Sequence, residues 1–312
     1  MIPHPRTPVL ITGGAGFIGT NLADRLLSDG HTVLLLDNLS RAGVRRNLTW
    51  LVERHGRTVE RFVGDVRDAA TVKRAVRAAG TVFHLAAQVA VTTSLESPID
   101  DFETNARGTL NVLEAIRETG NRTPILYTST NKVYGTLAAP EVTMVNGRYA
   151  PADPALRTSG IDESQPLDFH SPYGCSKGAA DQYVLDYARI FAIPAVVFRM
   201  SCIYGPHQCG NEDQGWVAHF LLRALARAPI TIFGDGRQVR DALYADDLVA
   251  AMTLAIRRIE ATNGRAFNLG GGPDNAVSLL ELLEMIRGVH GAAPEVEFRD
   301  WRPADQRYYV SD

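Results

Sequence analysis

The chain has 312 residues with 32 basic and 35 acidic side chains, and its formal net charge of −3 gives no support to nucleic-acid or membrane-surface binding. No apolar stretch reaches the roughly 18 residues that a membrane span needs, and the N-terminal segment lacks the apolar core of a signal peptide. The three cysteines are few and odd in number, which is typical of free thiols in a reducing compartment, so we expect a cytoplasmic globular protein.

Short apolar runs alternate with helix-period segments through the first half of the chain, and this alternation predicts a parallel sheet covered by helices. The predicted strands are Val9–Thr12, Thr32–Leu36, Arg61–Gly64, Val82–Leu85, Ile125–Thr128 and Ala195–Arg199. The predicted helices are Phe17–Ser28, Ala69–Ala78, Phe102–Glu118 and Tyr173–Phe191. The pattern indicates an α/β fold with a Rossmann-type, doubly wound parallel sheet.

The stretch Leu137–Pro172 interrupts this alternation, because it is rich in proline and shows no clear period. An irregular connection of this length between two candidate catalytic segments favours a functional loop over a site. From Ser201 onward the sequence indicates a smaller mixed α/β lobe. We expect residues 1–200 and 241–270 to form the Rossmann domain, and residues 201–240 and 271–312 to form a substrate lobe.

A glycine cluster lies between the first predicted strand and the first predicted helix. Gly13, Gly16 and Gly19 permit a tight turn, close approach of the backbone to a pyrophosphate and close helix packing. The next strand leads to Asp37, whose carboxylate can accept hydrogen bonds from both ribose hydroxyls and repels a 2′-phosphate. This pattern predicts a dinucleotide site and favours NAD, while Arg41 and Arg45 leave NADP open.

Asp65 and Val66 follow the third predicted strand, where a parallel sheet presents residues to its ligand. We expect both residues to meet the adenine edge of the dinucleotide. The alternative is that Asp65 is an ordinary loop aspartate.

Tyr173 and Lys177 are one turn apart on the same face of a predicted helix. A free tyrosine has a pKa near ~10, so a tyrosine that acts as a base near neutrality needs its pKa lowered by about 3 units. A neighbouring ammonium and a positive nicotinamide ring can supply that shift. The spacing alone also fits a solvated helix face, but Thr128–Thr130 at the end of the fifth strand favours a site, with Thr130 sharing a proton with Tyr173.

Several motifs together resemble the extended short-chain dehydrogenase/reductase family of sugar-nucleotide enzymes. They are the glycine cluster, His84-Leu85-Ala86-Ala87, Asn105 with Gly108-Thr109, the Thr128–Thr130 strand end and the Tyr173/Lys177 pair. The similarity covers nearly the whole chain. The resemblance implies that Tyr173 is the base, that Lys177 also binds the nicotinamide ribose and that Asn105 supports Lys177 through water.

The resemblance leads to three sets of expected site residues, with NAD as cofactor and no metal. The catalytic set is Thr130, Tyr173 and Lys177, to which we add Asn131. The expected cofactor-binding residues are Gly13, Gly16, Phe17, Ile18, Gly19, Asp37, Asn38, Asp65, Val66, Leu85, Ala86, Ala87, Asn105, Thr128, Tyr173, Lys177 and Met200. The expected substrate-binding residues are Gln88, Thr130, Asn131, Trp216, Arg240 and Arg302.

The two residues that follow Thr130 decide the expected reaction. Related 4,6-dehydratases carry Asp-Glu there and related decarboxylases carry a glutamate at the second position, whereas this chain has Asn131 and Lys132. Without these carboxylates elimination lacks its proton donor, so inversion of one carbinol centre with a recycled NAD is the chemistry that is left. The segment 129–135 is also similar to the CDP-tyvelose (CDP-paratose) 2-epimerase group, which acts at C2 of a CDP-linked dideoxyhexose.

Alternatives to this reading stay open. Asn131, which we link to the choice of C2, can instead serve only to cap the strand end. A 4-epimerase or another sugar-nucleotide redox enzyme of the same family is the nearest rival. A catalytically silent NAD-sensing regulator is a rival of another class, although it has no need for an intact Thr130, Tyr173 and Lys177.

A nucleotide-diphosphate sugar needs cationic groups at its diphosphate, and Arg240 and Arg302 match family positions of that kind. Each arginine alone is more often a surface charge, and Trp216 is as suited to core packing as to facing the base or sugar. The resemblance further implies a homodimer through the helices at Phe102–Glu118 and Tyr173–Phe191. It also implies a closing helical segment beyond Arg307–Val310.

Overall fold

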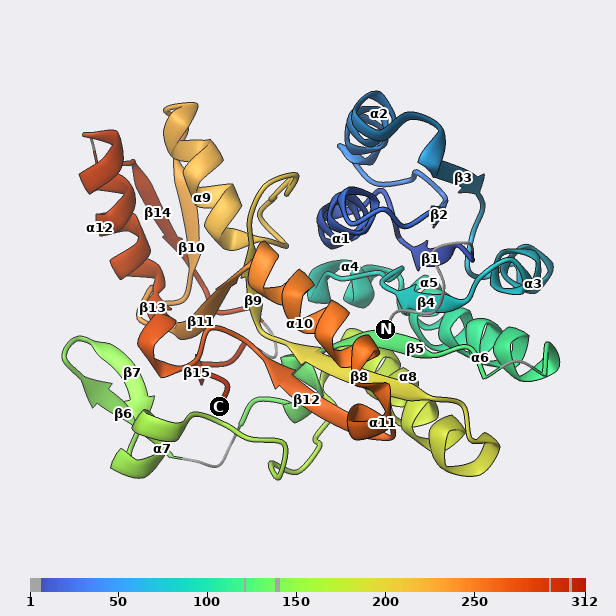
Figure 1. Ribbon diagram of the computed structural model, residues 1–312. Coiled ribbons are helices and arrows are strands. Elements are labelled where there is room, and N and C mark those ends of the chain that lie inside the picture. Colours follow the sequence, from blue (N-terminus) through green and yellow to red (C-terminus); the bar gives the residue numbers. More distant parts are fainter. Residues whose placement is uncertain (1–6, 121, 138–140, 292, 303–304) are drawn as a thin grey trace.

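A seven-stranded parallel sheet forms the centre of the larger lobe (Figure 1). The computed structural model describes residues 7–120, 122–137, 141–291, 293–302 and 305–312. The strand order is β12-β8-β5-β4-β1-β2-β3, and every pair is parallel. The strands are β1 (Val9–Thr12), β2 (Val33–Asp37), β3 (Val59–Val63), β4 (Thr81–His84), β5 (Ile125–Thr130), β8 (Ala195–Met200) and β12 (Arg265–Leu269). The predicted doubly wound Rossmann-type sheet is confirmed.

Helices cover both faces of this sheet, because alternate residues of each buried strand point to opposite sides. Leu10 packs in a core with the helices α3 (Ala69–Arg77), α6 (Gly108–Glu118) and α8 (Ser171–Phe191). Its neighbours Val9 and Ile11 pack in the opposite core with α1 (Phe17–Ser28), α2 (Val44–His55) and α10 (Ala245–Arg257). The carboxyl ends of the strands consequently form one edge between the two helical layers.

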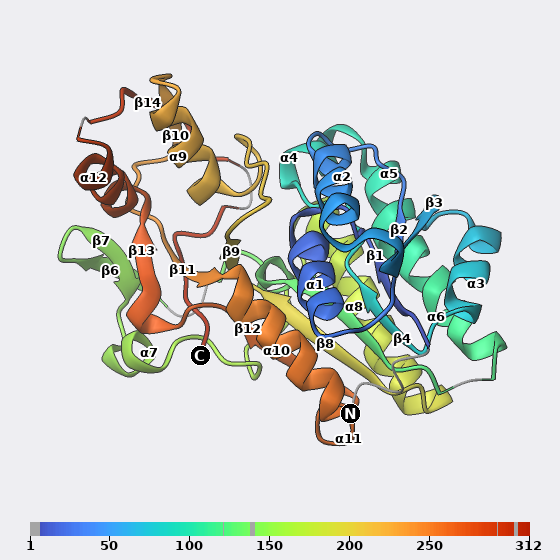
Figure 2. The same ribbon diagram turned by 45° about the horizontal axis from the view of Figure 1, so that its top comes forward.

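The smaller lobe lies beside that edge and has its own core (Figure 2). Its strands are β9 (Cys202–Tyr204), β11 (Val239–Tyr244), β13 (Ala276–Ser278) and β15 (Tyr308–Tyr309) in one sheet, and β10 (Ile230–Phe233) with β14 (Val296–Arg299) in another. The helices α9 (Trp216–Leu225) and α12 (Leu279–His290) bury Phe220, Leu283 and Ile286 against β10. Ser278 and Glu281 form a capping box that fixes the start of α12.

The stretch expected to be an irregular loop contains regular structure. It holds an antiparallel hairpin of β6 (Val142–Val145) and β7 (Arg148–Pro151), followed by the short helix α7 (Pro154–Ser159). Arg148 reaches Glu281 at 3.1 Å, and the Tyr149 ring lies 6.3 Å from Trp301. The hairpin therefore packs on the smaller lobe. Pro151 ends β7 and Pro154 starts α7, two positions at which proline is tolerated.

Other elements differ from the sequence prediction in extent. The helix expected at Phe102–Glu118 is present but starts earlier and is not uniform, because α5 (Pro98–Phe102) passes through a π-helical turn at Glu103–Arg107 into α6. The helix α2 was not predicted, and β5 runs on to Thr130. The shorter pieces are α4 (Val91–Glu96), α11 (Ile259–Thr262), and the 3₁₀ turns at Gly56–Thr58, Asn131–Tyr134 and Pro273–Asn275. Among the described residues, none of the helices combines the length and apolar character that a membrane span needs.

Candidate active site

The glycine cluster forms a tight turn between β1 and α1. Gly13 has φ +67°, and a Cβ there would lie 2.8 Å from the backbone nitrogen of Ala86, so only glycine fits without strain. Gly16 is the N-cap of α1 and provides no side-chain cap, and the first turn carries no acidic residue. The amides at Phe17 and Ile18 therefore begin a helix whose positive end is left for an anion such as a pyrophosphate.

Asp37 ends β2 beside this turn and is fixed in place by two backbone amides. Its Oδ2 accepts from Ala15 N at 3.1 Å and its Oδ1 accepts from Leu39 N at 2.8 Å. Burial raises the pKa of this carboxyl above its usual range, and the two amides oppose that shift. Arg41, which left NADP open, donates instead to Gln214 Oε1 of the smaller lobe at 2.8 Å.

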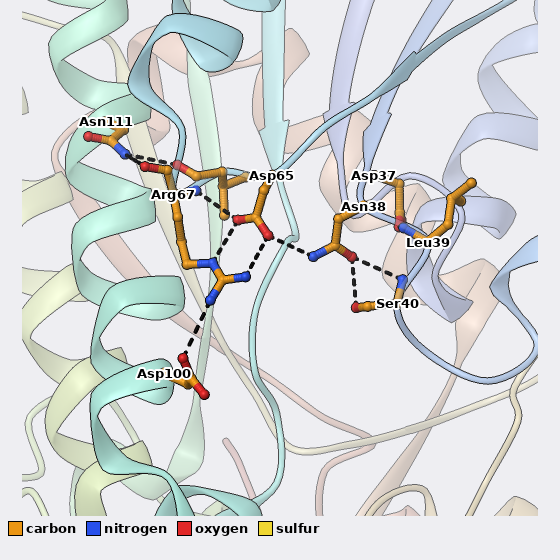
Figure 3. A network of polar contacts seen from close by, with 9 residues as sticks. Asp37, Asn38, Leu39, Ser40, Asp65, Arg67, Asp100 and Asn111 are labelled. Carbon is orange, nitrogen blue, oxygen red and sulfur yellow. Dashed lines mark hydrogen bonds and ion pairs between the residues drawn. The ribbon is translucent and has the colours of Figure 1, made fainter.

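The loops after β2 and β3 are joined by a network around Asp65 (Figure 3). Asn38 Nδ2 donates to Asp65 Oδ2 at 2.9 Å, and Arg67 donates from Nε and Nη2 to the two carboxylate oxygens at 3.0 and 2.9 Å. The hydrogen bonds from Arg67 lower the pKa of Asp65 to about 2. Val66 follows in this loop, and its carbonyl oxygen accepts from Asn111 at 2.9 Å. Arg67 was not predicted, although its position two residues after Asp65 suits such a pair.

A buried chain of hydroxyl and imidazole groups connects β1, β4 and α6. Thr109 donates to the carbonyl oxygen of Asn105 at 2.6 Å, so its oxygen is left to accept from His84 Nε2 at 2.9 Å. His84 Nδ1 then accepts from Thr12 Oγ1 at 2.6 Å, and that oxygen accepts from the amides of Leu85 and Ala86 at 3.2 Å. Burial, assisted by the charge of a nearby lysine, lowers the pKa of His84 to about 3, so the ring is neutral.

The Tyr173/Lys177 pair lies on the buried face of α8, opposite the end of β5. Lys177 Nζ donates to the carbonyl oxygen of Thr128 at 2.5 Å and lies 4.3 Å from the centre of the Tyr127 ring. Burial lowers the pKa of Lys177 to about 7. Thr130 forms a hydrogen bond with Tyr173 that favours the tyrosinate, but burial outweighs it and raises the Tyr173 pKa to about 12.

In the protein without cofactor the pKa of Tyr173 is raised, so the lowering that we expect from Lys177 together with a nicotinamide ring stays a prediction. The Lys177 ammonium donates to the carbonyl oxygen of Thr128. A positive charge that arrives next to the hydroxyl has to supply the shift, as a nicotinamide ring does.

The π-helical turn places Asn105 behind the lysine. Asn105 Oδ1 accepts from Gln88 N at 2.9 Å, and its Nδ2 reaches Ser176 Oγ at 3.0 Å and Asp101 Oδ1 at 3.1 Å. Ser176 Oγ also donates to Asp101 Oδ2 at 2.5 Å. Asn105 is therefore hydrogen-bonded to Ser176, the residue before Lys177, from a position within the π turn. Asp101 and Ser176 were not predicted.

The remaining cofactor-set residues lie along the same carboxyl edge of the sheet. They follow β4, lie within β5 or end β8: Leu85, Ala86, Ala87, Thr128 and Met200. Gln88 comes next, and its side chain is turned back on its own loop, with Nε2 donating to Ala90 O at 2.7 Å. Among the described residues, no group of three or more His, Cys, Asp or Glu side chains is placed to hold a metal ion.

Asn131 and Arg240 are both tied to the last part of the chain. Asn131 Nδ2 donates to Gln306 Oε1 at 3.3 Å, and Asn131 Oδ1 lies 3.3 Å from Thr130 Oγ1, as an alternative acceptor for the one hydroxyl proton that Thr130 can instead donate to Tyr173. Arg240 Nη2 donates to Asp305 Oδ1 at 2.9 Å and to the Gln306 carbonyl oxygen at 2.6 Å. Asn131 therefore connects Thr130 to the segment that also positions Arg240.

Arg302 and Trp216 lie on the α9 side of the smaller lobe. Arg302 contacts Asp213 Oδ1 at 3.3 Å, and its guanidinium lies 3.8 Å from the centre of the Phe233 ring. Trp216 Nε1 donates to Cys202 Sγ at 3.0 Å, and its ring meets Phe220 at a centroid distance of 5.9 Å. Trp216 thus has one core contact, with Phe220, and one polar contact, with Cys202. The two predicted arginines have different carboxylate partners, Asp305 for Arg240 and Asp213 for Arg302.

Comparison with known proteins finds relatives along almost the whole chain. The model of the NAD dependent epimerase/dehydratase family matches residues 9–270. The chain belongs to this family. CDP-paratose 2-epimerase of Salmonella typhi is 45% identical over 311 residues, which cover 97% of this chain and 90% of the relative.

More distant members extend the range of reactions among the relatives. A dTDP-glucose 4,6-dehydratase of Xanthomonas campestris is 30% identical over 322 residues, covering 97% of this chain and 84% of the relative. The structure of Thermus thermophilus UDP-glucose 4-epimerase in complex with NAD superposes with a TM-score of 0.81 at 33% identity, covering 98% of this chain and 90% of that one. These findings confirm the predicted family and fold, NAD as the cofactor and an epimerase-type enzyme.

Residues 206–214 of the smaller lobe form a strap across the glycine turn. Asn47 Nδ2 donates to His207 O at 3.1 Å and to Ala15 O at 3.3 Å, and Asn21 Nδ2 donates to Pro206 O at 2.9 Å. At its far end the strap is bonded to Arg41 through Gln214. Helices α1 and α2 are therefore joined to the smaller lobe directly over the turn.

Proposed function

We propose that this enzyme inverts C2 of a CDP-linked deoxyhexose through a transient keto sugar. The observation that carries the proposal is the composition of the segment after β5, where Thr130 is followed by an amide and an ammonium group, Asn131 and Lys132, and not by carboxylates. Tyr173 and Lys177 complete the set that oxidation and reduction of a carbinol need. The 45% identity to CDP-paratose 2-epimerase supports the ring position and the nucleobase.

The residues of the chain would divide the work as follows. Tyr173 takes the proton of the sugar hydroxyl, and Thr130 hydrogen-bonds to Tyr173 and orients its phenolic oxygen. NAD, when bound, supplies the hydride acceptor and returns the hydride. Burial of Tyr173 and Lys177 excludes water from the keto sugar. Inversion requires the sugar ring to present its other face before it is reduced again.

The described residues fit NAD at three points. The uncapped start of α1 behind Gly13 and Gly16 receives the pyrophosphate. The fixed carboxylate of Asp37 receives the adenosine ribose, with Asn38, Asp65 and Val66 at the adenine end. Lys177 receives the nicotinamide ribose, and the other cofactor-set residues line the sheet edge between these points. We keep the domain division stated above as part of the proposal, although the β6–β7 hairpin packs on the smaller lobe.

A C4 epimerase is the second candidate. The Thr130, Tyr173 and Lys177 set does not depend on which ring carbon carries the reacting hydroxyl. A UDP-glucose 4-epimerase of Mycolicibacterium smegmatis is 36% identical over 299 residues, which favours this alternative at a lower level of similarity. Both candidates use the same residues, so they are separated only by the product.

The deciding experiment offers CDP-, UDP-, GDP- and dTDP-linked sugars to the NAD-loaded enzyme in deuterated water and follows the ring protons by NMR. We expect inversion at C2 of a CDP-linked deoxyhexose without uptake of deuterium, because the hydride is recycled. Inversion at C4 supports the second candidate. Deuterium beside a carbonyl carbon indicates enolisation or elimination and contradicts both.

We further propose a cytoplasmic homodimer engaged in deoxysugar biosynthesis. Exposed apolar side chains on α5 and α8 support a helix-to-helix interface: Ile99, Phe102, Tyr183, Ile190 and Phe191. The three cysteines are free, as in a reducing compartment. Sedimentation of the protein gives its mass in solution, and a monomer at micromolar concentration contradicts the dimer.

A further inference from the structure

Two cations share one carboxylate oxygen at the junction of the lobes. Lys132 Nζ lies 3.6 Å from Asp305 Oδ1, and Arg240 Nη2 lies 2.9 Å from the same oxygen. Arg240 is buried and Lys132 is largely so, with 20% of its side chain exposed. Burial and the nearby charge of Arg240 contribute to a Lys132 pKa of about 8, while Asp305 opposes this shift. Two cations this close need an anion between them, and here the anion comes from the chain itself.

The backbone places Lys132 next to the reacting end of the site. Its amide donates to Thr130 Oγ1 at 3.2 Å, and its carbonyl oxygen accepts from Gly135 N at 3.1 Å, which closes the 3₁₀ turn. Arg240 comes from β11 of the smaller lobe, where it pairs in register with Val277 and Tyr309. The cluster therefore joins the catalytic segment to the substrate lobe.

We propose that Lys132 and Arg240 bind one phosphate group of the sugar nucleotide together, and that Asp305 takes the place of that phosphate when no substrate is bound. The inference rests on the proposed function and names a residue of the substrate site. A phosphate oxygen suits the position of Asp305 Oδ1, because ammonium and guanidinium groups both form charge-assisted hydrogen bonds to phosphate. Asp305 then acts as an internal counter-ion that keeps the two cations in place.

The position of Lys132 also bears on the ring carbon that reacts. C2 of the sugar is bonded to the anomeric carbon that carries the diphosphate, whereas C4 lies across the ring. A phosphate bound by Lys132, two residues from Thr130, places the neighbouring C2 near Thr130 and Tyr173. Lys132 is thereby a specificity-determining residue that favours reaction at C2.

The test measures binding of CDP, inorganic diphosphate and cytidine to the NAD-loaded protein by calorimetry. We expect Lys132→Met to weaken CDP and diphosphate binding about tenfold or more, as loss of a hydrogen bond to a charged group does, and to leave cytidine binding unchanged. Lys132→Arg should restore most of the affinity. Lys73→Met is the matched control, because Lys73 is a partly exposed lysine paired with Glu118.

Asp305→Asn tests the counter-ion separately, and we expect it to bind CDP more tightly because the internal competitor is neutralised. Unchanged CDP binding by Lys132→Met, with NAD content and circular dichroism unaltered, overturns the phosphate assignment. Weaker CDP binding by Asp305→Asn overturns the counter-ion role. A protein that shows the expected Lys132 dependence but inverts no CDP-sugar contradicts the proposed function alone.

Discussion

Lys177 donates a 2.5 Å hydrogen bond to the backbone oxygen of Thr128, and this bond joins the lysine of α8 to strand β5. The ammonium lies over the Tyr127 ring, where a cation is stabilised by the π face. Because Lys177 is engaged in this way, the ionisation of Tyr173 depends on what binds beside it.

Tyr173→Phe should abolish turnover and leave NAD bound, because it removes the hydroxyl that accepts the substrate proton and keeps the ring. We expect a loss of at least about a hundredfold in kcat, in line with removal of a general base. Tyr244→Phe, at a partly exposed tyrosine that ends β11, is the control and should behave as wild type. NMR of the sugar product and NAD absorbance after denaturation measure the two effects. Unchanged turnover in Tyr173→Phe would contradict the mechanism.

Asp101→Asn should change the pH dependence of the reaction. The Asp101 carboxylate raises the pKa of Lys177 against the effect of burial, so its loss lowers that pKa further below about 7. The ammonium form is then lost at lower pH, and the alkaline limb of the kcat/KM profile should move down by roughly one pH unit. Asp100→Asn, on the exposed adjacent position, is the control. A profile that coincides with wild type rules out this role of Asp101.

Asp37→Ser should reduce the preference for NAD over NADP. The serine removes the negative charge that repels a 2′-phosphate. It also has one oxygen where Asp37 has two, so one of the amides of Ala15 and Leu39 loses its acceptor. We expect the ratio of the two affinities to change by about tenfold or more in favour of NADP. Calorimetric titration of cofactor-depleted protein with each dinucleotide measures the ratio. If NADP is still rejected as strongly as by wild type, discrimination lies elsewhere.

Acid should destabilise the protein through His84. The folded-state pKa is about 3, while the unfolded chain binds the proton near the ordinary value of 6.5. Above pH 6.5 the ring is neutral in both states, so His84 causes no loss of stability there. Between pH 6.5 and about 3 only the unfolded chain binds the proton, so the unfolding free energy falls by about 1.4 kcal/mol for each unit by which the pH drops. Urea unfolding at pH 7, 6 and 5 measures this slope. His84→Gln should show a smaller slope, and His290→Gln, at the end of α12, should keep the wild-type slope.

The sequence predicted the fold and the cofactor turn well, because each depends on local patterns. Apolar runs and the Gly13 to Asp37 spacing are visible in short windows, and a parallel sheet brings its strand ends to one edge. The sequence pattern predicted one uniform helix at residues 102–118, because a π-helical turn leaves the apolar period nearly intact. Asn105 owes its position to that turn.

The partners of the substrate-site residues could not be predicted in the same way. Arg240 and Arg302 were expected to converge on one ligand, but their carboxylate partners come from Asp305 and from Asp213. These contacts join residues far apart in the chain and depend on how the smaller lobe lies against the sheet. Periodicity carries no information on such pairs, so Asp101 was missed, and Lys132 was used as a motif residue without a place in the expected substrate-binding set.

The strap at residues 206–214 has a consequence for how long the cofactor stays. It belongs to the smaller lobe, yet it is hydrogen-bonded to α1 and α2 on both sides of the glycine turn. We expect release of NAD to require those bonds to break and the lobes to part, so that an opening of the protein sets its residence time. Sugar products can be exchanged many times within one such interval, and a catalyst that regenerates its own oxidant at each turnover works best when that oxidant does not leave.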